Sequence, residues 1–210
     1  YALKDIEEGD LVVANDPHVA GGTHLPDINL AMPVFIDGAP VAFVCNIAHH
    51  ADVGGMAPGS MAGGMSEIYQ EGLRIPVVKL FRAGVLQEDL FEILLLNVRI
   101  PEERRGDYYA QIASCRLGER RLKEAAETFS IALLQSAFEE IIERTERRMR
   151  KGVTRIPDGT YTFEDVMDDD GLGTVDIPIR AKIIVTGDRI MFDFTGTASQ
   201  VAGNINVTLN

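Results

Sequence analysis

The first half of the chain shows short hydrophobic runs separated by glycine and proline, a pattern typical of β-strands. The runs fall between Gly9 and about Pro101 and read LVVA, INLAMPVFI, VAFVCNIA and IPVVKLF. An Asp37-Gly38 pair, typical of tight hairpin turns, separates the second run from the third. The sequence therefore predicts an antiparallel hairpin with strands over residues 28–36 and 41–48.

The hydrophobic spacing changes to a helical period between Leu90 and Lys151. In the second part of this stretch, residues three or four positions apart form one largely apolar stripe: Leu122, Ala126, Phe129, Leu133, Ala137, Ile141, Thr145 and Met149. The stripe predicts one long amphipathic helix. A shorter helix precedes it and ends near Pro101.

Strand patterns return after the segment IPDGTYTF. The runs IRAKIIV and IMFDFTG, joined by a turn at TGDR, predict a second hairpin. The order β, then α, then β favours an α+β fold over regular βαβ winding. We expect a β-rich region over 1–101, a helical region over 102–152 and an antiparallel β region over 153–210, all parts of one larger domain. The chain starts at Tyr1 and stops within an apolar alternation, so we expect it to be a fragment of a longer chain.

Composition and charge exclude several classes of partner. The 210 residues are 46% hydrophobic, enough for a substantial core, and the net charge is −12. The densest basic stretch, residues 143–151, is interrupted by acids and is typical of a solvated helix face. We therefore expect no nucleic acid and no anionic membrane surface as partner. No apolar run approaches the length of a membrane span and no signal-peptide pattern is present, which favours a cytoplasmic location.

The two cysteines, Cys45 and Cys115, lack CxxC spacing and predict neither a disulfide scaffold nor a thiolate metal site. Because Cys45 lies inside the apolar run VAFVCNIA, we expect it to be a buried small hydrophobic residue.

The predicted hairpin brings separate polar residues together. With a turn at Asp37-Gly38, the numbers of opposed residues sum to about 75 or 76, which places Asp27 opposite Ala48 or His49. The open end of the hairpin would then collect five side chains from the loop before it and the segment after it: His24, Asp27, His49, His50 and Asp52. Three of the four histidines in the chain belong to this set.

Imidazole and carboxylate together suit a divalent transition metal such as Zn, Mn or Fe(II). Two histidines and one carboxylate leave positions open for water or substrate, as a catalytic metal needs. The alternative is a hydrogen-bonded turn cluster that binds no metal, with Asp27 serving as a turn residue. The residues alone leave both interpretations open.

Other segments carry weaker signals. The glycine-rich stretch 54–64 lacks the GK[ST] of a phosphate-binding loop, so it is a mobile substrate loop or a plain connection. Glu71 could act as an acid or base, although a glutamate at a helix end is usually exposed. The stretch 165–173 lacks the full ligand pattern of a calcium loop and is interpreted as an acidic turn.

Seven segments, in order and spread over nearly the whole chain, resemble the hydantoinase B/oxoprolinase family: GDLVVANDP, GGTHLPDINLAMPVF, HHADVGGMAPGSM, IYQEGLRIPVVKL, PEERRGDYYAQIASCRLGERRL, IPDGTYTFED and DFTGTASQVAGNIN. That family includes B subunits of ATP-dependent N-methylhydantoinases, the C-terminal half of 5-oxoprolinases, caprolactamase-type lactamases, and the metal-bearing subunits of acetone and acetophenone carboxylases.

The resemblance implies a metal site at His24, Asp27 and His49, with Zn or Mn as the ion. It implies that ATP is bound by a partner, the A-type subunit, which phosphorylates the carbonyl oxygen of a small cyclic amide substrate. The B-type subunit would then open the ring of a hydantoin, 5-oxoproline or lactam. His50 and Asp52 would orient a ligand or move a proton.

Two alternatives remain at this point. The chain could belong to an ATP-dependent ketone carboxylase, but the resemblance to the carboxylases leads us to expect glutamine at position 50, so His50 favours the hydrolases. It could also be a non-catalytic partner whose polar cluster is structural. In each case we expect a hetero-oligomer.

Overall fold

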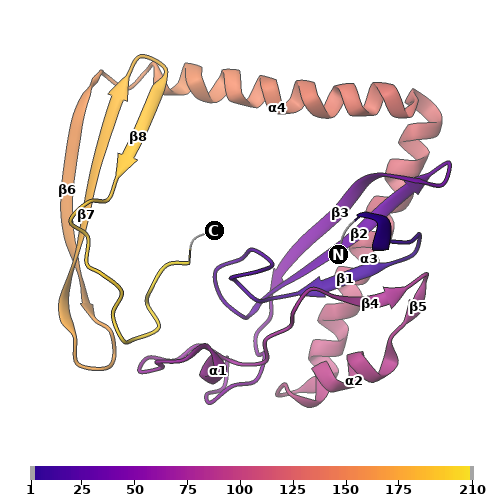
Figure 1. Ribbon diagram of the computed structural model, residues 1–210, viewed down its shortest axis with the longest axis horizontal. Coiled ribbons are helices and arrows are strands. Elements are labelled where there is room, and N and C mark those ends of the chain that lie inside the picture. Colours follow the sequence, from indigo (N-terminus) through magenta and orange to yellow (C-terminus); the bar gives the residue numbers. More distant parts are fainter. Residues whose placement is uncertain (1–2, 209–210) are drawn as a thin grey trace. The chain divides into compact units, whose positions relative to one another are not determined.

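The computed structural model describes residues 3–208 and divides them into two compact units. The first contains the described residues up to Thr128 together with 207–208, and the second is Phe129–Asn206 (Figure 1). Helices and antiparallel sheets are both present, so the predicted α+β class is confirmed. The boundary falls inside the helical region expected over 102–152.

The first unit is built on one antiparallel sheet with the strand order β3-β2-β1-β4-β5. Its strands are β1 (Leu11–Ala14), β2 (Asp27–Ile36), β3 (Ala39–His49), β4 (Val78–Arg82) and β5 (Val85–Leu86). A short 3₁₀ helix (Leu3–Asp5) precedes the sheet, and a short helix α1 (Ile68–Glu71) lies between β3 and β4.

The hairpin of β2 and β3 has the predicted turn and register. Asp37 and Gly38 both have positive φ, 51° and 77°, the backbone that Asp-Gly turns adopt between twisted strands. Opposed residues sum to 76 from Asp27 to Val34 and to 75 after a register shift between Val34 and Phe35. Asp27 therefore pairs with His49, one of the two partners expected.

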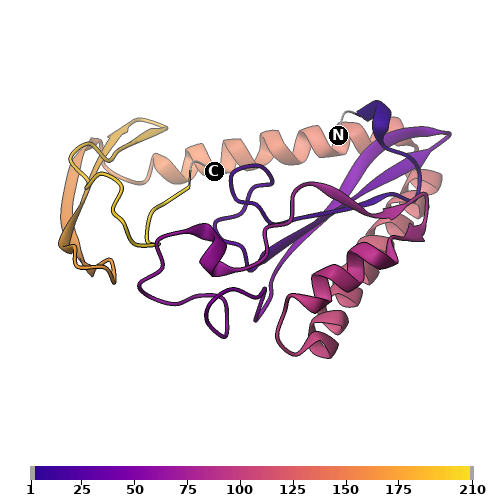
Figure 2. The same cartoon turned by 60° about the horizontal axis from the view of Figure 1, so that its bottom comes forward.

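Helices α2 (Glu88–Leu96) and α3 (Pro101–Phe129) lie along one side of this sheet (Figure 2). The contact of α3 with β3 is close, because a Cβ added to Gly118 would lie 2.7 Å from Val44 Cγ1. Side chains from the sheet and both helices form the core, with Leu11, Ile28, Leu30, Leu80, Phe91, Leu94, Tyr108, Ile112 and Cys115 among its buried members.

Cys45 lies on the outer face of β3 and is exposed, so the expectation that it is buried was wrong. Successive side chains of a strand point to opposite faces. Val44 and Asn46 face α3, so Cys45 points to the other side, where Phe43 and Ile47 are also exposed. The apolar run VAFVCNIA therefore does not mark a strand buried on both faces.

The single long helix predicted through Phe129 and Leu133 is wrong. Ser130 has φ 67° and separates α3 from a second helix, α4 (Ile131–Val153). The Ser130 hydroxyl accepts a hydrogen bond from the Leu133 amide, so this serine caps the new helix. The apolar spacing continues across the break, and for that reason the hydrophobic pattern does not reveal it.

The second unit contains α4 and a three-stranded antiparallel sheet of order β6-β7-β8. Its strands are β6 (Gly159–Asp169), β7 (Val175–Thr186) and β8 (Arg189–Asp193), and the β7–β8 hairpin confirms the second predicted hairpin. The acidic turn expected over 165–173 is shorter, because β6 continues to Asp169. Asp170 closes the turn by accepting hydrogen bonds from the Leu172 and Thr174 amides.

Within the described part of the chain, no helix combines the length and apolar character needed to cross a membrane.

A buried ion pair ties Asp10, directly before β1, to Lys79 of β4. The Asp10 carboxylate is fully buried, lies 2.6 Å from Lys79 Nζ and accepts hydrogen bonds from the Glu7 and Ala83 amides. Burial would raise the pKa of Asp10, but the hydrogen bonds and charge of Lys79 and the two amides outweigh it, so the pKa lies below its ordinary value.

We expect Asp10→Asn to lower the free energy of unfolding by about 3 kcal/mol, because it removes the buried carboxylate charge that faces Lys79 Nζ. The exposed Asp89→Asn is the control and should cost less than about 1 kcal/mol. Because the folded-state pKa of Asp10 is lowered, its stabilisation is complete above about pH 4 and is lost as pH falls further. Urea unfolding at pH 7 and pH 3 measures both effects. Equal losses in the two variants at pH 7 would contradict the assignment.

Candidate metal centre

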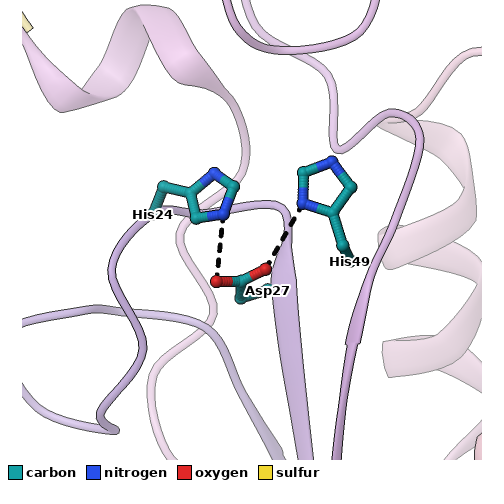
Figure 3. Close-up of side chains that lie close together, drawn as sticks. All are labelled: His24, Asp27 and His49. Atoms are coloured by element: carbon teal, nitrogen blue, oxygen red, sulfur yellow. Dashed lines mark hydrogen bonds and ion pairs between the residues drawn. The ribbon is translucent and has the colours of Figure 1, made fainter.

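Three side chains converge at the open end of the β2–β3 hairpin. Asp27 is the first residue of β2, His49 is the last residue of β3, and His24 lies in the loop that enters β2 (Figure 3). His24 Nε2 lies 3.0 Å from Asp27 Oδ2, and His49 Nδ1 lies 3.3 Å from Asp27 Oδ1. One ligand atom from each of the three residues lies within 4.8 Å of the other two.

The cluster follows from strand pairing and from the conformation of the loop. Asp27 and His49 are directly opposed, so their side chains leave the sheet on the same face. Gly22 has φ 88°, a conformation that favours glycine, and lets the loop turn beside Asp27. Leu25, fully buried in the core, anchors the loop directly after His24.

The donor set fits a divalent metal. The side chains of His24, Asp27 and His49 are 26%, 17% and 53% exposed, so the cluster is accessible from one side. Two imidazole nitrogens and a carboxylate are suitable ligands for Zn or Mn and leave coordination positions open. Among the described residues, this is the one group of three or more such side chains whose ligand atoms converge.

His50 does not join the cluster, although it follows His49 directly. The alternation of the strand sends its ring to the opposite face, where it is 2% exposed. His50 Nε2 lies 2.8 Å from Gln111 Oε1, and the ring lies against Tyr108. Burial lowers the pKa of His50, so the neutral ring is favoured.

Asp52 is also engaged elsewhere. Its carboxylate accepts hydrogen bonds from the backbone amides of Gly54, Gly59 and Arg99 and from the Arg99 guanidinium. Arg99 also donates to the carbonyls of Gly54, Gly55 and Ala57. Asp52, which the sequence placed next to the metal ligands, instead holds the start of the glycine-rich segment 54–64 in place.

Sequence reasoning missed Gln111, which supports the hairpin end from α3. Its amide nitrogen donates to the Ile28 carbonyl at 3.0 Å and to Asn46 Oδ1 at 2.9 Å, while its oxygen faces His50. A signal was present, because Tyr108, Gln111, Ile112 and Cys115 share the helical spacing of one buried face. A glutamine on such a face needs polar partners across the interface.

The whole chain, residues 1–210, matches the family model described as hydantoinase B/oxoprolinase. The chain belongs to the hydantoinase B/oxoprolinase family. Caprolactamase subunit beta of Pseudomonas jessenii is 35% identical over 185 residues, which cover 88% of this chain and 32% of that protein. The solved structure of the ATP-dependent caprolactamase from the same species matches with a TM-score of 0.82 at 34% identity, over 90% of this chain and 32% of that chain.

An acetone carboxylase structure in its nucleotide-free form matches with a TM-score of 0.76 at 23% identity, over 91% of this chain and 27% of that chain. At this identity the likeness is one of fold alone. The chain spans about a third of the length of the first curated relatives that it matches.

We expect Gln111→Leu to lower the free energy of unfolding by about 2 kcal/mol, because the Ile28 carbonyl, Asn46 Oδ1 and His50 Nε2 each lose their hydrogen bond to the Gln111 side chain. Gln135→Leu, at an exposed position of α4, is the matched control and should change stability by less than about 0.5 kcal/mol. Chemical unfolding followed by circular dichroism gives both values. A similar small effect in the two variants would show that the Gln111 network does not support the hairpin.

Proposed function

We propose that this chain is part of the B-type subunit of an ATP-dependent cyclic amidohydrolase, which opens a hydantoin, 5-oxoproline or lactam ring. The observation that carries the proposal is the convergence of His24, Asp27 and His49 at an accessible hairpin end in a hydantoinase B/oxoprolinase chain. The 34% identity to an ATP-dependent caprolactamase supports the cyclic amide as substrate class.

The proposal divides the reaction between two subunits. An A-type partner binds ATP and phosphorylates the carbonyl oxygen of the substrate, which activates the amide carbon for attack. The name "subunit beta" of the caprolactamase relative supports a hetero-oligomer, and the lack of a GK[ST] phosphate loop in this chain agrees with ATP binding by the partner.

His24, Asp27 and His49 would hold a Zn or Mn ion through Nε2, a carboxylate oxygen and Nδ1. When bound, such an ion supplies a Lewis acid that polarises an oxygen and lowers the pKa of coordinated water. Asp27 contacts both histidines and fixes their rings relative to each other. The 53% exposure of His49 leaves a path for the substrate to approach.

We assign positioning roles to His50 and Asp52. The His50 amide donates to the Pro26 carbonyl at 2.8 Å, which closes the hairpin end one residue from both Asp27 and His49. The His50 ring holds the same end against α3 through Gln111. Asp52 fixes the following segment through Arg99. Because the His50 and Asp52 side chains make these contacts with Gln111 and Arg99, we assign them roles in holding the site in place and no direct part in the reaction.

The test is ring opening by the full-length protein assembled with its ATP-binding partner. We expect Asp27→Ala to lower the rate of amino acid release by on the order of 100-fold or more, because Asp27 joins the whole cluster. His18→Ala is the matched control, since His18 is the remaining histidine, is exposed and lies outside the cluster. Its rate should equal that of the wild type.

Two results would redirect the assignment. Substrate-dependent fixation of bicarbonate, without ring opening, would identify a carboxylase that uses the same cluster. Full activity of the assembled Asp27→Ala protein would favour a structural role for the cluster and contradict the proposal.

A further inference from the structure

One buried nitrogen of the cluster has no hydrogen-bond partner in the part of the chain that the structure describes. His24 Nε2 faces Asp27, while His24 Nδ1 is buried and makes no hydrogen bond within the described residues. If Nε2 binds a metal, Nδ1 carries the proton of the neutral ring and needs an acceptor. Histidine ligands usually donate this proton to a carboxylate, a carbonyl or water, and the acceptor fixes the orientation of the ring.

The buried side chain of Asn15 holds two segments side by side at this point. Asn15 Nδ2 donates to the Leu25 carbonyl at 2.8 Å and to the Leu73 carbonyl at 2.9 Å. Leu25 directly follows His24, and Leu73 lies two residues after Glu71, the last residue of α1. The segment that carries His24 is thereby fixed next to the end of α1.

The end of α1 is itself held tightly. The Leu73 amide donates to the Val53 carbonyl and the Met56 amide donates to the Gln70 carbonyl. A Cβ added to Gly55 would lie 2.4 Å from the Gln70 carbonyl oxygen, so the two segments are in direct contact there. Glu71 therefore sits on a backbone with little freedom to move away.

The Glu71 carboxylate lies against the His24 segment. It interacts with the Leu25 backbone amide and electrostatically with His24, and it is half-buried, in contrast to the exposed glutamate usual at a helix end. Burial raises the pKa of Glu71, and the interactions with His24 and with the Leu25 amide lower it in part. Glu71 is thus a carboxylate close to a histidine that lacks an acceptor.

We propose that Glu71 is a positioning residue of the metal centre, whose carboxylate accepts the Nδ1 proton of His24 and holds the ring with Nε2 directed at the ion. Glu71 is not among the three residues whose ligand atoms converge, so we assign it a role that acts through His24. This inference rests on the metal site of the proposed function. It connects the metal centre with the segment SEIYQEGLRIP, which contains Glu71.

The test measures Zn²⁺ affinity of the full-length protein by competition with a chromogenic chelator. Glu71→Met removes the acceptor at similar size, and we expect it to weaken binding about 10- to 100-fold. Glu71→Gln keeps an acceptor oxygen without the charge, so its loss should be smaller. Glu102→Gln, a surface glutamate on α3, is the control and should bind as the wild type does.

A double-mutant cycle separates this role from a general structural one. In a His24→Ala background, measured at added Zn²⁺ concentrations that fill its weakened site, Glu71→Met should cause no further loss of Zn²⁺ affinity, because the group that it orients is gone. An equal loss in both backgrounds would overturn the proposal, as would affinity within twofold of the wild type for both Glu71 variants. If Glu71→Met does not fold, the near-isosteric Glu71→Gln carries the cycle. Absence of Zn²⁺ binding by the wild type would instead defeat the proposed metal site itself.

Discussion

The pairing register of β2 with β3 is the constraint on which the candidate centre depends. It places Asp27 opposite His49 and sends both side chains to the face of the sheet away from α3. A slip of one residue would move a strand's side chains to the other face. The Asp37-Gly38 turn sets the pairing next to it, and the register shift between Val34 and Phe35 brings Asp27 opposite His49. The His50 amide, bound to the Pro26 carbonyl, closes the other end of the hairpin.

Polar side chains buried on either side of this hairpin end hold it in place. On the helix side, Gln111 joins His50, Asn46 and the Ile28 backbone. Near the loop before β2, Asn15 ties the Leu25 carbonyl to the Leu73 carbonyl. Such buried groups are stable only when their hydrogen bonds are made, so each network specifies one arrangement of the segments it joins. The cluster therefore rests on a rigid support, which a preorganised metal site needs.

The sequence was sufficient for the hairpin, because the Asp37-Gly38 turn signal and the strand pattern determine it locally. It brought His24, Asp27 and His49 to the same end, but it left Ala48 and His49 open as the partner of Asp27, and the register shift between Val34 and Phe35 decides for His49. It misplaced the side chain of His50. The pairing of residue numbers puts His50 near Asp27 along the strand, but it does not say that neighbouring side chains point to opposite faces of the sheet. The partners of His50 and Asp52, Gln111 and Arg99, are 61 and 47 residues away, and only the packed fold brings them together. The break between α3 and α4 at Ser130 was not predicted either, because the apolar spacing continues through it.

Metal content of the purified full-length protein tests the central claim most directly. Inductively coupled plasma mass spectrometry would compare the wild type with His24→Ala and with the control His18→Ala. The account predicts a near-stoichiometric transition metal, Zn or Mn, in the wild type and control and its loss in His24→Ala. No metal in any of the three proteins, or full retention in His24→Ala, would contradict a metal centre at the hairpin end.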